Sequence, residues 1–277
     1  MAPLSLTLAL LAMAVATVAN GVVLLGMARD SFDDRYEGCG PAMTAGLQDL
    51  IRSEFQKNPV LSQIWPEAVI EWQKRGSPVS PLPSPDQAIA LMAFTMGAHH
   101  EFNTAVLQAG RSRQQYRDNF QYKSLHFLLT QALATLREPL KGQCLDVFYQ
   151  KCYDNVVAQR GATVRFGQFL ITSLKKENGG GCPEGTEFQV RTCHGAGIQY
   201  FSQHPEYEWV LIPPYETFEV TNFTRRVFRE QIQLRSTGTH SKYNCQWLKG
   251  GSIPSTHFHL GGLLLATTAL AVATGIL

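Results

Sequence analysis

The sequence predicts an α+β fold, in which a helical N-terminal part and a β-rich C-terminal part meet near Gly142. Before this point, apolar residues recur at three- and four-residue spacing, the period of helices that pack on a core. After it, short runs rich in β-branched and aromatic residues are typical of strands. Helices that come first and strands that follow, with no internal repeat, indicate an α+β domain.

The helical part holds four segments with this spacing, at residues 43–55, 60–72, 87–96 and 123–137. In the last segment the apolar side chains form one wide stripe, which predicts a helix packed on a core; the stripe consists of Leu125, Leu128, Leu129, Ala132, Leu133 and Leu136. Residues 77–85 contain four prolines. This stretch predicts a connector inside the helical part without a separate domain.

The β-rich part holds six runs with strand character, at residues 145–149, 156–166, 188–192, 209–212, 217–222 and 227–234. No pair of cysteines has CxxC spacing, and the eight histidines are scattered. We therefore expect no metal site. His99 and His100 are most simply explained as a helix end.

The two ends of the chain predict entry into the secretory pathway and a lipid anchor. Residues 4–19 form an apolar run that ends in small residues, which predicts a signal peptide over 1–19. Residues 260–277 are apolar, with no charge after them. The small residues Gly250-Gly-Ser252 precede a short spacer, so we expect a GPI-attachment propeptide over 253–277, with a single-pass anchor as the alternative.

Removal of both signals leaves one predicted ectodomain at 20–252, mainly helical over 30–141 and mainly β over 142–245. The formal net charge is +2, and the basic residues form no stripe, so we expect no nucleic-acid partner. The sequon Asn222-Phe-Thr224 predicts a glycan on a secreted chain, with burial of Asn222 as the alternative.

Six cysteines in an extracellular chain indicate disulfides, although the spacing does not determine how they pair. Three groups of motifs carry more information. They are Cys144-Leu-Asp-Val147, then Val164-Arg-Phe-Gly-Gln-Phe169 with Ser173-Leu174, then Thr192-Cys-His-Gly195 followed by Val210-Leu-Ile-Pro-Pro214. With Ser31-Phe-Asp-Asp34 and Phe102-Asn103 in the helical part, these motifs resemble the vertebrate ecto-mono-ADP-ribosyltransferases over nearly the whole mature chain.

The resemblance implies a β-rich core of two sheets that holds NAD in a cleft. It implies an arginine-specific reaction that moves ADP-ribose from NAD to an arginine of a target protein, and a GPI-anchored protein on the outer cell surface. It also implies the disulfides Cys39–Cys245 and Cys144–Cys193. Cys152 and Cys182 are additional, and could form a third bridge, remain free thiols or link two molecules.

The family's chemistry needs three kinds of side chain. Cleavage of the nicotinamide–ribose bond develops positive charge on the ribose, which a carboxylate stabilises. An arginine fork holds the NAD phosphates, and a serine positions the ribose. The resemblance places Tyr149 where the arginine is expected, Ile171 where the first serine is expected and Trp209 where the catalytic glutamate is expected. All three positions are therefore changed.

Neighbouring residues offer two alternatives. Glu206 and Glu208 form a Glu-x-Glu one residue closer to the N-terminus than expected, and Glu208 could reach the sugar if the strand bulges there. Arg160-Gly161 is an Arg-Gly pair, but it is more simply a surface arginine near a turn. Gln168, Ser173 and Ser202 match family positions in or beside the nucleotide cleft, although strand and turn contacts could equally explain Gln168 and Ser202.

Two functional hypotheses follow. One is an arginine-specific ADP-ribosyltransferase that uses NAD as co-substrate and acts through shifted residues. The other is a degenerate member with weak or lost activity, or a non-catalytic GPI-anchored surface protein that uses the fold for ligand or partner binding. The replaced residues favour the second hypothesis, and the glycine-rich loop at 178–183 indicates a reshaped cleft wall.

Overall fold

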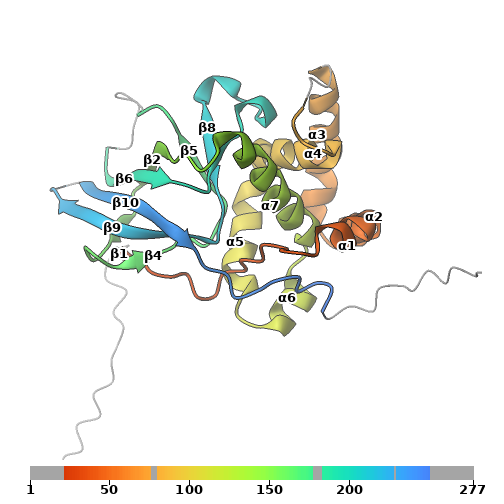
Figure 1. The fold of residues 1–277 in the computed structure, drawn as a ribbon, viewed down its shortest axis with the longest axis horizontal. Helices are drawn as coiled ribbons and strands as arrows, with labels where there is room; N and C mark the ends of the chain where they lie inside the picture. The colour runs from red at the N-terminus through yellow and green to blue at the C-terminus, as the bar shows by residue number, and fades with distance from the viewer. Residues whose placement is uncertain (1–21, 76–79, 177–182, 228, 250–277) are drawn as a thin grey trace, which may run out of the picture.

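The computed structural model describes residues 22–75, 80–176, 183–227 and 229–249. The expected signal peptide, the attachment propeptide, Cys182 and most of the glycine-rich loop lie outside these ranges. Helices occupy one side of the molecule and strands the other (Figure 1). Within the described ranges, no helix is both long enough and apolar enough to cross a membrane. The α+β class predicted from the sequence is confirmed.

The helical side contains α1 Gly40–Ala45, α2 Leu47–Phe55, α3 Pro59–Lys74, α4 Pro85–Ala93, a π-helical turn η1 Phe94–Ala98, α5 His99–Ala109, α6 Arg113–Asn119, α7 Lys123–Arg137 and the 3-10 turn η2 Glu138–Leu140. All four predicted helical segments are helical. The pattern missed α5 and α6, because α6 buries a single side chain, Tyr116, and α5 buries only three, Phe102, Val106 and Ala109. His99 and His100 begin α5.

The first turn of α7 is buried, and a carboxylate from α2 caps it. Glu54 accepts hydrogen bonds from the backbone N–H of Lys123 at 2.5 Å and of Ser124 at 3.0 Å. These N–H groups have no partner inside the helix, and the helix dipole favours a negative charge at this end. Burial nevertheless raises the pKa of Glu54. This contact joins α2 to α7 and orients the central helix against the core.

The β side contains β1 Val22–Leu24, β2 Leu145–Cys152, β3 Asn155–Val157, β4 Thr163–Val164, β5 Leu170–Ser173, β6 Gly185–Thr192, β7 Ala196–Gly197, the 3-10 turns η3 Gln199–Phe201 and η4 Pro205–Tyr207, β8 Trp209–Ile212, β9 Glu216–Arg225 and β10 Arg229–Thr239. The single strand expected at 156–166 is wrong. The segment is two short strands, β3 and β4, and Gly161 in the turn between them has φ +80°, which favours glycine.

The strands are hydrogen-bonded in the order β4-β9-β10-β6-β2-β5-β8-β7, and β1 pairs with β3 separately. The resemblance implied two sheets. Here the two groups of strands join through one residue pair, Phe148 with Ser173, between β2 and β5. On either side of this join the pairing is extensive, with eight residue pairs between β2 and β6 and four between β5 and β8. The sheet therefore separates where β2 and β5 diverge.

The Ser31-Phe-Asp-Asp34 motif holds the end of the fold in place. Asp33 forms a fully buried ion pair with Arg165 at 2.5 Å, and Asp34 accepts backbone N–H groups of Cys245 and Gln246 at 2.9 and 2.8 Å. Buried charges are tolerated when they are paired and hydrogen-bonded. The disulfide Cys39–Cys245 closes the same region, so the chain from 30 to 39 is tied to the chain from 240 to 246.

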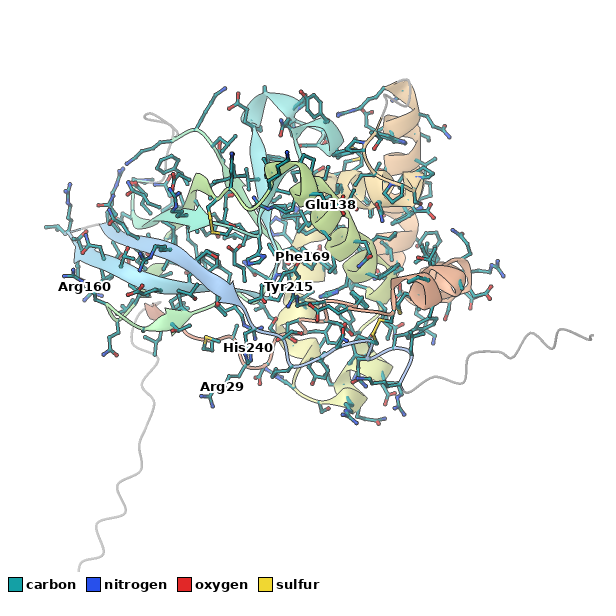
Figure 2. All side chains as sticks on the ribbon, in the orientation of Figure 1. Arg29, Glu138, Arg160, Phe169, Tyr215 and His240 are labelled. Carbon is teal, nitrogen blue, oxygen red and sulfur yellow. A yellow bond between two sulfur atoms is a disulfide. The ribbon has the colours of Figure 1, made fainter. Side chains whose placement is uncertain are left out.

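Other motif residues also have structural roles. Asn103 of α5 exchanges two hydrogen bonds with the backbone of Phe169, at 2.8 and 3.1 Å. Figure 2 shows Phe169 between the helical and β sides of the molecule. Glu216 accepts the N–H groups of Cys193 and His194 at 2.7 and 3.1 Å, which fixes the turn after β6. These contacts hold the motif segments in place.

The structure contains the two disulfides that the resemblance implied, Cys39–Cys245 and Cys144–Cys193. The second lies at the start of β2 and the end of β6, next to eight paired residues. Cys152 is also disulfide-bonded, so the free-thiol alternative does not apply to it.

Candidate active site

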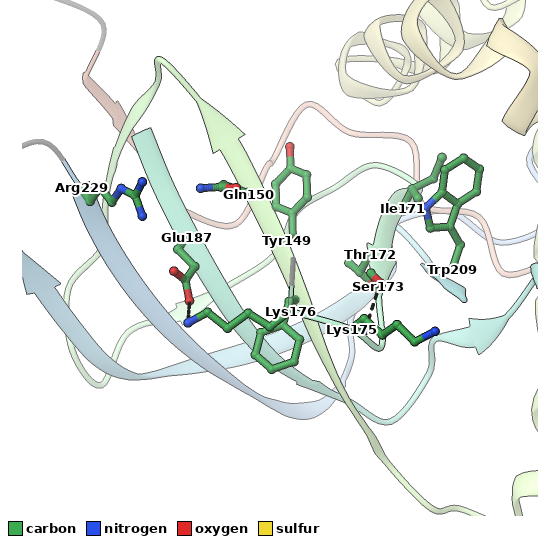
Figure 3. A pocket seen from close by; sticks show the side chains of 11 residues that line it. Tyr149, Gln150, Ile171, Thr172, Ser173, Lys175, Lys176, Glu187, Trp209 and Arg229 are labelled. Atoms are coloured by element: carbon green, nitrogen blue, oxygen red, sulfur yellow. Dashed lines mark hydrogen bonds and ion pairs between the residues drawn. The ribbon is translucent and has the colours of Figure 1, made fainter. Parts of the chain in front are cut away.

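A pocket of about 280 Å³ lies where β2 and β5 diverge, and side chains from five strands and a loop line it (Figure 3). Its lining residues include the three positions at which the family's chemistry is expected. The full set is Phe148, Tyr149, Gln150, Ile171, Thr172, Ser173, Lys175, Lys176, Glu187, Trp209 and Arg229.

Tyr149 occupies the position expected for the arginine. Its ring packs against Phe166 and Phe188 at centroid distances of 6.4 and 5.6 Å. Burial raises the pKa of Tyr149 above that of a free phenol, so the side chain is neutral at physiological pH. A neutral hydroxyl offers one donor, whereas a guanidinium offers five donors and a permanent charge. Tyr149 therefore cannot replace an arginine that clamps phosphates.

Ile171 and Trp209 lie side by side on the other side of the pocket from Tyr149 (Figure 3). Ile171 packs against the apolar core formed with the helices, where a serine would present a hydroxyl. Trp209 begins β8 and stacks on Tyr207, with ring centroids 5.5 Å apart and an angle of 29° between the ring planes. An apolar surface thus lies where the resemblance implies a hydroxyl and a carboxylate.

Ser173 is the one family serine that remains, and its hydroxyl serves the backbone. It donates to the Tyr207 carbonyl at 3.0 Å and accepts from the Lys175 N–H at 3.0 Å. The Leu174 N–H donates to the Glu208 carbonyl at 3.3 Å. These bonds tie the end of β5 to the turn before β8.

Glu208 lies just before β8 and is absent from the pocket lining. Its backbone is left-handed, with φ 48° and ψ 50°, and its carboxylate pairs with Lys175 at 2.9 Å. The β5–β8 register runs without a shift from Leu170–Ile212 to Ser173–Trp209. The paired residues show no bulge, and the Glu208 side chain is directed to Lys175 rather than into the pocket. Glu206 pairs with His204 at 3.2 Å outside the pocket.

The remaining sequence-predicted residues lie elsewhere. Gln168 lines a different hollow, beside Phe166 and Phe188. Ser202 is fully buried, and its hydroxyl accepts the His204 N–H at 3.0 Å, which fits the turn-contact alternative. Arg160 is exposed at the end of the sheet farthest from the helices (Figure 2).

The structure adds four charged residues that sequence reasoning did not assign to the site, Lys175, Lys176, Glu187 and Arg229. Lys176 pairs with Glu187 at 2.6 Å. Nothing in the local sequence pattern links Lys175-Lys176 to Glu187 or Arg229. Strand order could have found Glu187 and Arg229, because β6 pairs with β2 and β10 pairs with β6. Among the described residues, no cluster of His, Cys, Asp and Glu could hold a metal ion.

Known proteins resemble this chain in sequence and in fold. The family model of the NAD:arginine ADP-ribosyltransferases matches residues 25–242. The chain belongs to this family. It is 46% identical to the chicken (Gallus gallus) erythroblast NAD(P)(+)-arginine ADP-ribosyltransferase over 234 residues, covering 82% of this chain and 77% of the relative. Identity to the human (Homo sapiens) GPI-linked NAD(P)(+)-arginine ADP-ribosyltransferase 1 is 39% over 273 residues, covering 92% and 84%.

The fold matches a solved family structure. The crystal structure of the eucaryotic mono-ADP-ribosyltransferase ART2.2 superposes with a TM-score of 0.70 at 32% identity, covering 80% of this chain and 98% of that chain. A mutant of the same protein was solved in complex with NAD, and it superposes equally well at 31% identity. NAD is thus the co-substrate of the family to which this chain belongs.

Proposed function

We propose that this protein is a degenerate ADP-ribosyltransferase with little or no capacity to transfer ADP-ribose from NAD to protein arginine. The observation that carries the proposal is the composition of the pocket. Tyr149, Ile171 and Trp209 all line it, so the three changed positions meet in one place rather than being scattered by an error of register.

The loss of the carboxylate is the most severe change. The ribose cation that forms as nicotinamide leaves needs a fixed negative charge nearby. Among the described residues that line the pocket, the one acid is Glu187, and Lys176 neutralises it at 2.6 Å. Glu208 is paired with Lys175 in the same way. Neither carboxylate stands at the position expected for the catalytic glutamate, which Trp209 occupies.

Three other properties belong to the same proposal. The protein is held on the outer cell surface by a GPI anchor, which the name of the human GPI-linked relative supports. The chain uses the retained pocket to bind a ligand or partner. Any residual transfer is directed to arginines of other proteins, as the names of the relatives support.

The test is transfer of label from NAD to an arginine-rich acceptor by protein purified from mammalian cells. We expect activity at least about a thousandfold below that of an active relative, since the loss of one catalytic group alone often costs orders of magnitude. Activity comparable to the relative that disappears in Glu208→Gln would overturn the proposal and support catalysis through the shifted carboxylate. Loss in Glu187→Gln instead would assign that role to Glu187.

A gain-of-function variant tests the same proposal by restoring the expected residues and measuring whether transfer rises. Tyr149→Arg, Ile171→Ser and Trp209→Glu together should raise transfer, whereas each single replacement should not, because these groups act as a unit. The single variants are the matched controls. A triple variant that folds, judged by its melting temperature, and binds NAD but remains inert would show that the loss lies outside these three positions.

A further inference from the structure

We infer that the pocket still binds a nucleotide diphosphate, and that Lys175, Lys176 and Arg229 hold its phosphates in place of the missing arginine. The inference rests on the proposed function, since it concerns a pocket that binds without transferring. Lys175 and Lys176 come from the segment after β5, and Arg229 comes from the start of β10.

The charge of the lining supports an anionic ligand. Three cationic side chains face one acid, Glu187, among the described residues of the pocket. The hydroxyls of Thr172 and Ser173 already donate to the Val210 and Tyr207 carbonyls, whereas the indole of Trp209 presents a flat apolar surface. A diphosphate joined to planar rings matches this combination of cations and an aromatic face.

The cations are held in position by the local structure. The Lys175 N–H donates to the Ser173 hydroxyl, and that hydroxyl donates to the Tyr207 carbonyl, both at 3.0 Å. The backbone of the Lys175 segment is thus fixed to the turn before β8. Arg229 pairs with Gly185 in the parallel β10–β6 register, and its Nε donates to the Pro183 carbonyl at 3.4 Å. The backbone at Lys175 is therefore held by the Ser173 hydroxyl, and the backbone at Arg229 is held by strand pairing.

The present ion pairs can give way to phosphate. The side chains of Lys175 and Glu208 are 63% and 42% exposed, and those of Lys176 and Glu187 are 49% and 20% exposed. Exposed pairs gain little net stabilisation, because water already solvates both charges. A diphosphate carries more charge than one carboxylate and accepts several donors at once, so it competes well for the same ammonium groups. The Glu187 carboxylate therefore competes with the phosphates of the ligand for Lys176.

The experiment measures binding to the purified protein, independent of transfer. The probes are NAD, ADP-ribose and inorganic pyrophosphate, with adenosine as the ligand that lacks phosphate. Titration calorimetry gives the dissociation constants, and quenching of Trp209, lost in Trp209→Phe, reports occupancy of the pocket. The variant is Lys175→Gln with Lys176→Gln and Arg229→Gln.

The matched control removes two lysines and one arginine at exposed sites away from the pocket, by Lys74→Gln, Lys141→Gln and Arg160→Gln. We expect the pocket variant to weaken NAD and ADP-ribose binding at least tenfold, and the control to stay within about twofold of wild type. Pyrophosphate should compete with ADP-ribose, and adenosine should bind far more weakly. Glu187→Gln should tighten binding of ADP-ribose about threefold, since it releases Lys176.

Equal affinities for NAD in the pocket variant and the wild type would overturn the inference, as would a wild type that binds no nucleotide. In both cases an absence of transfer would still support the proposed function. Conversely, strong transfer by the wild type would overturn the proposed function, while the affinities of the pocket variant would still decide whether these cations hold the phosphates.

Discussion

Acidification should destabilise this protein through His126, a histidine buried in α7 and fully inaccessible to water. Its Nδ1 lies 2.9 Å from the Tyr36 hydroxyl, and its Nε2 lies 3.3 Å from the Phe32 carbonyl. Because a carbonyl can only accept, Nε2 carries the proton and Nδ1 accepts from Tyr36. The surroundings therefore hold a neutral ring, and burial lowers the pKa of His126 from 6.5 to about 3.

The sign and size of the effect follow from linkage. The unfolded chain takes up a proton at this histidine near pH 6.5, whereas the folded chain does so only near pH 3. The contribution of His126 to the free energy of unfolding is thus fully present above pH 6.5 and is lost as the pH falls towards 3. At about 1.4 kcal/mol per pKa unit, the loss between about pH 7.5 and pH 4 is about 3 kcal/mol.

Other buried groups act in the opposite direction, so a variant must isolate the effect. Burial raises the pKa of the carboxyls of Asp34, Glu54 and Glu216, and their contribution to stability is present at low pH and lost as the pH rises through those raised values. Urea unfolding of the wild type and of His126→Gln across pH 7.5 to 4 gives two free-energy curves. Their difference cancels the carboxyls and should shrink by about 3 kcal/mol on acidification.

His204→Gln is the control, because that side chain is 46% exposed. Two results would refute the reasoning. One is a pair of parallel curves for the wild type and His126→Gln. The other is titration of the His126 ring near pH 6.5 in histidine-labelled NMR spectra of the wild type, a measurement that remains available if the variant does not fold.

Three further predictions concern packing and processing. Gly110→Ala should destabilise the fold by about 1–3 kcal/mol, since its Cβ would lie 1.9 Å from the Ser31 carbonyl oxygen. Gly26→Ala, whose Cβ would have no atom within 4 Å, is the control and should have the melting temperature of the wild type. Asn222 is only partly buried in β9, so protein from mammalian cells should gain gel mobility after glycosidase treatment, and unchanged mobility would contradict glycosylation. Phosphatidylinositol-specific phospholipase should release the protein from expressing cells if the chain is cut near 250–252; retention would favour a transmembrane anchor.

The sequence predicted most of the elements, because helix and strand periods are encoded within a few neighbouring residues. It placed α7 and most of the strands. The resemblance to the family added the prediction that Tyr149, Ile171 and Trp209 stand at the positions of the catalytic residues. The motif residues fix the register of the chain around them, through the Asp33–Arg165 pair and the Asn103 bonds to Phe169. The three positions could therefore be counted from the motifs. Weak patterns such as α6, with one buried residue, gave no signal.

The tertiary structure alone decided what surrounds the replaced positions. Sequence could not show that Lys176 and Glu187 meet across the pocket, or that Arg229 lies on the same rim, because these contacts depend on the order of β5, β6 and β10 in the sheet. Nor could it show that Glu208 adopts a left-handed backbone before β8 and pairs with Lys175. Local sequence determines which side chains are present, whereas pairing between strands distant in the chain determines which of them meet.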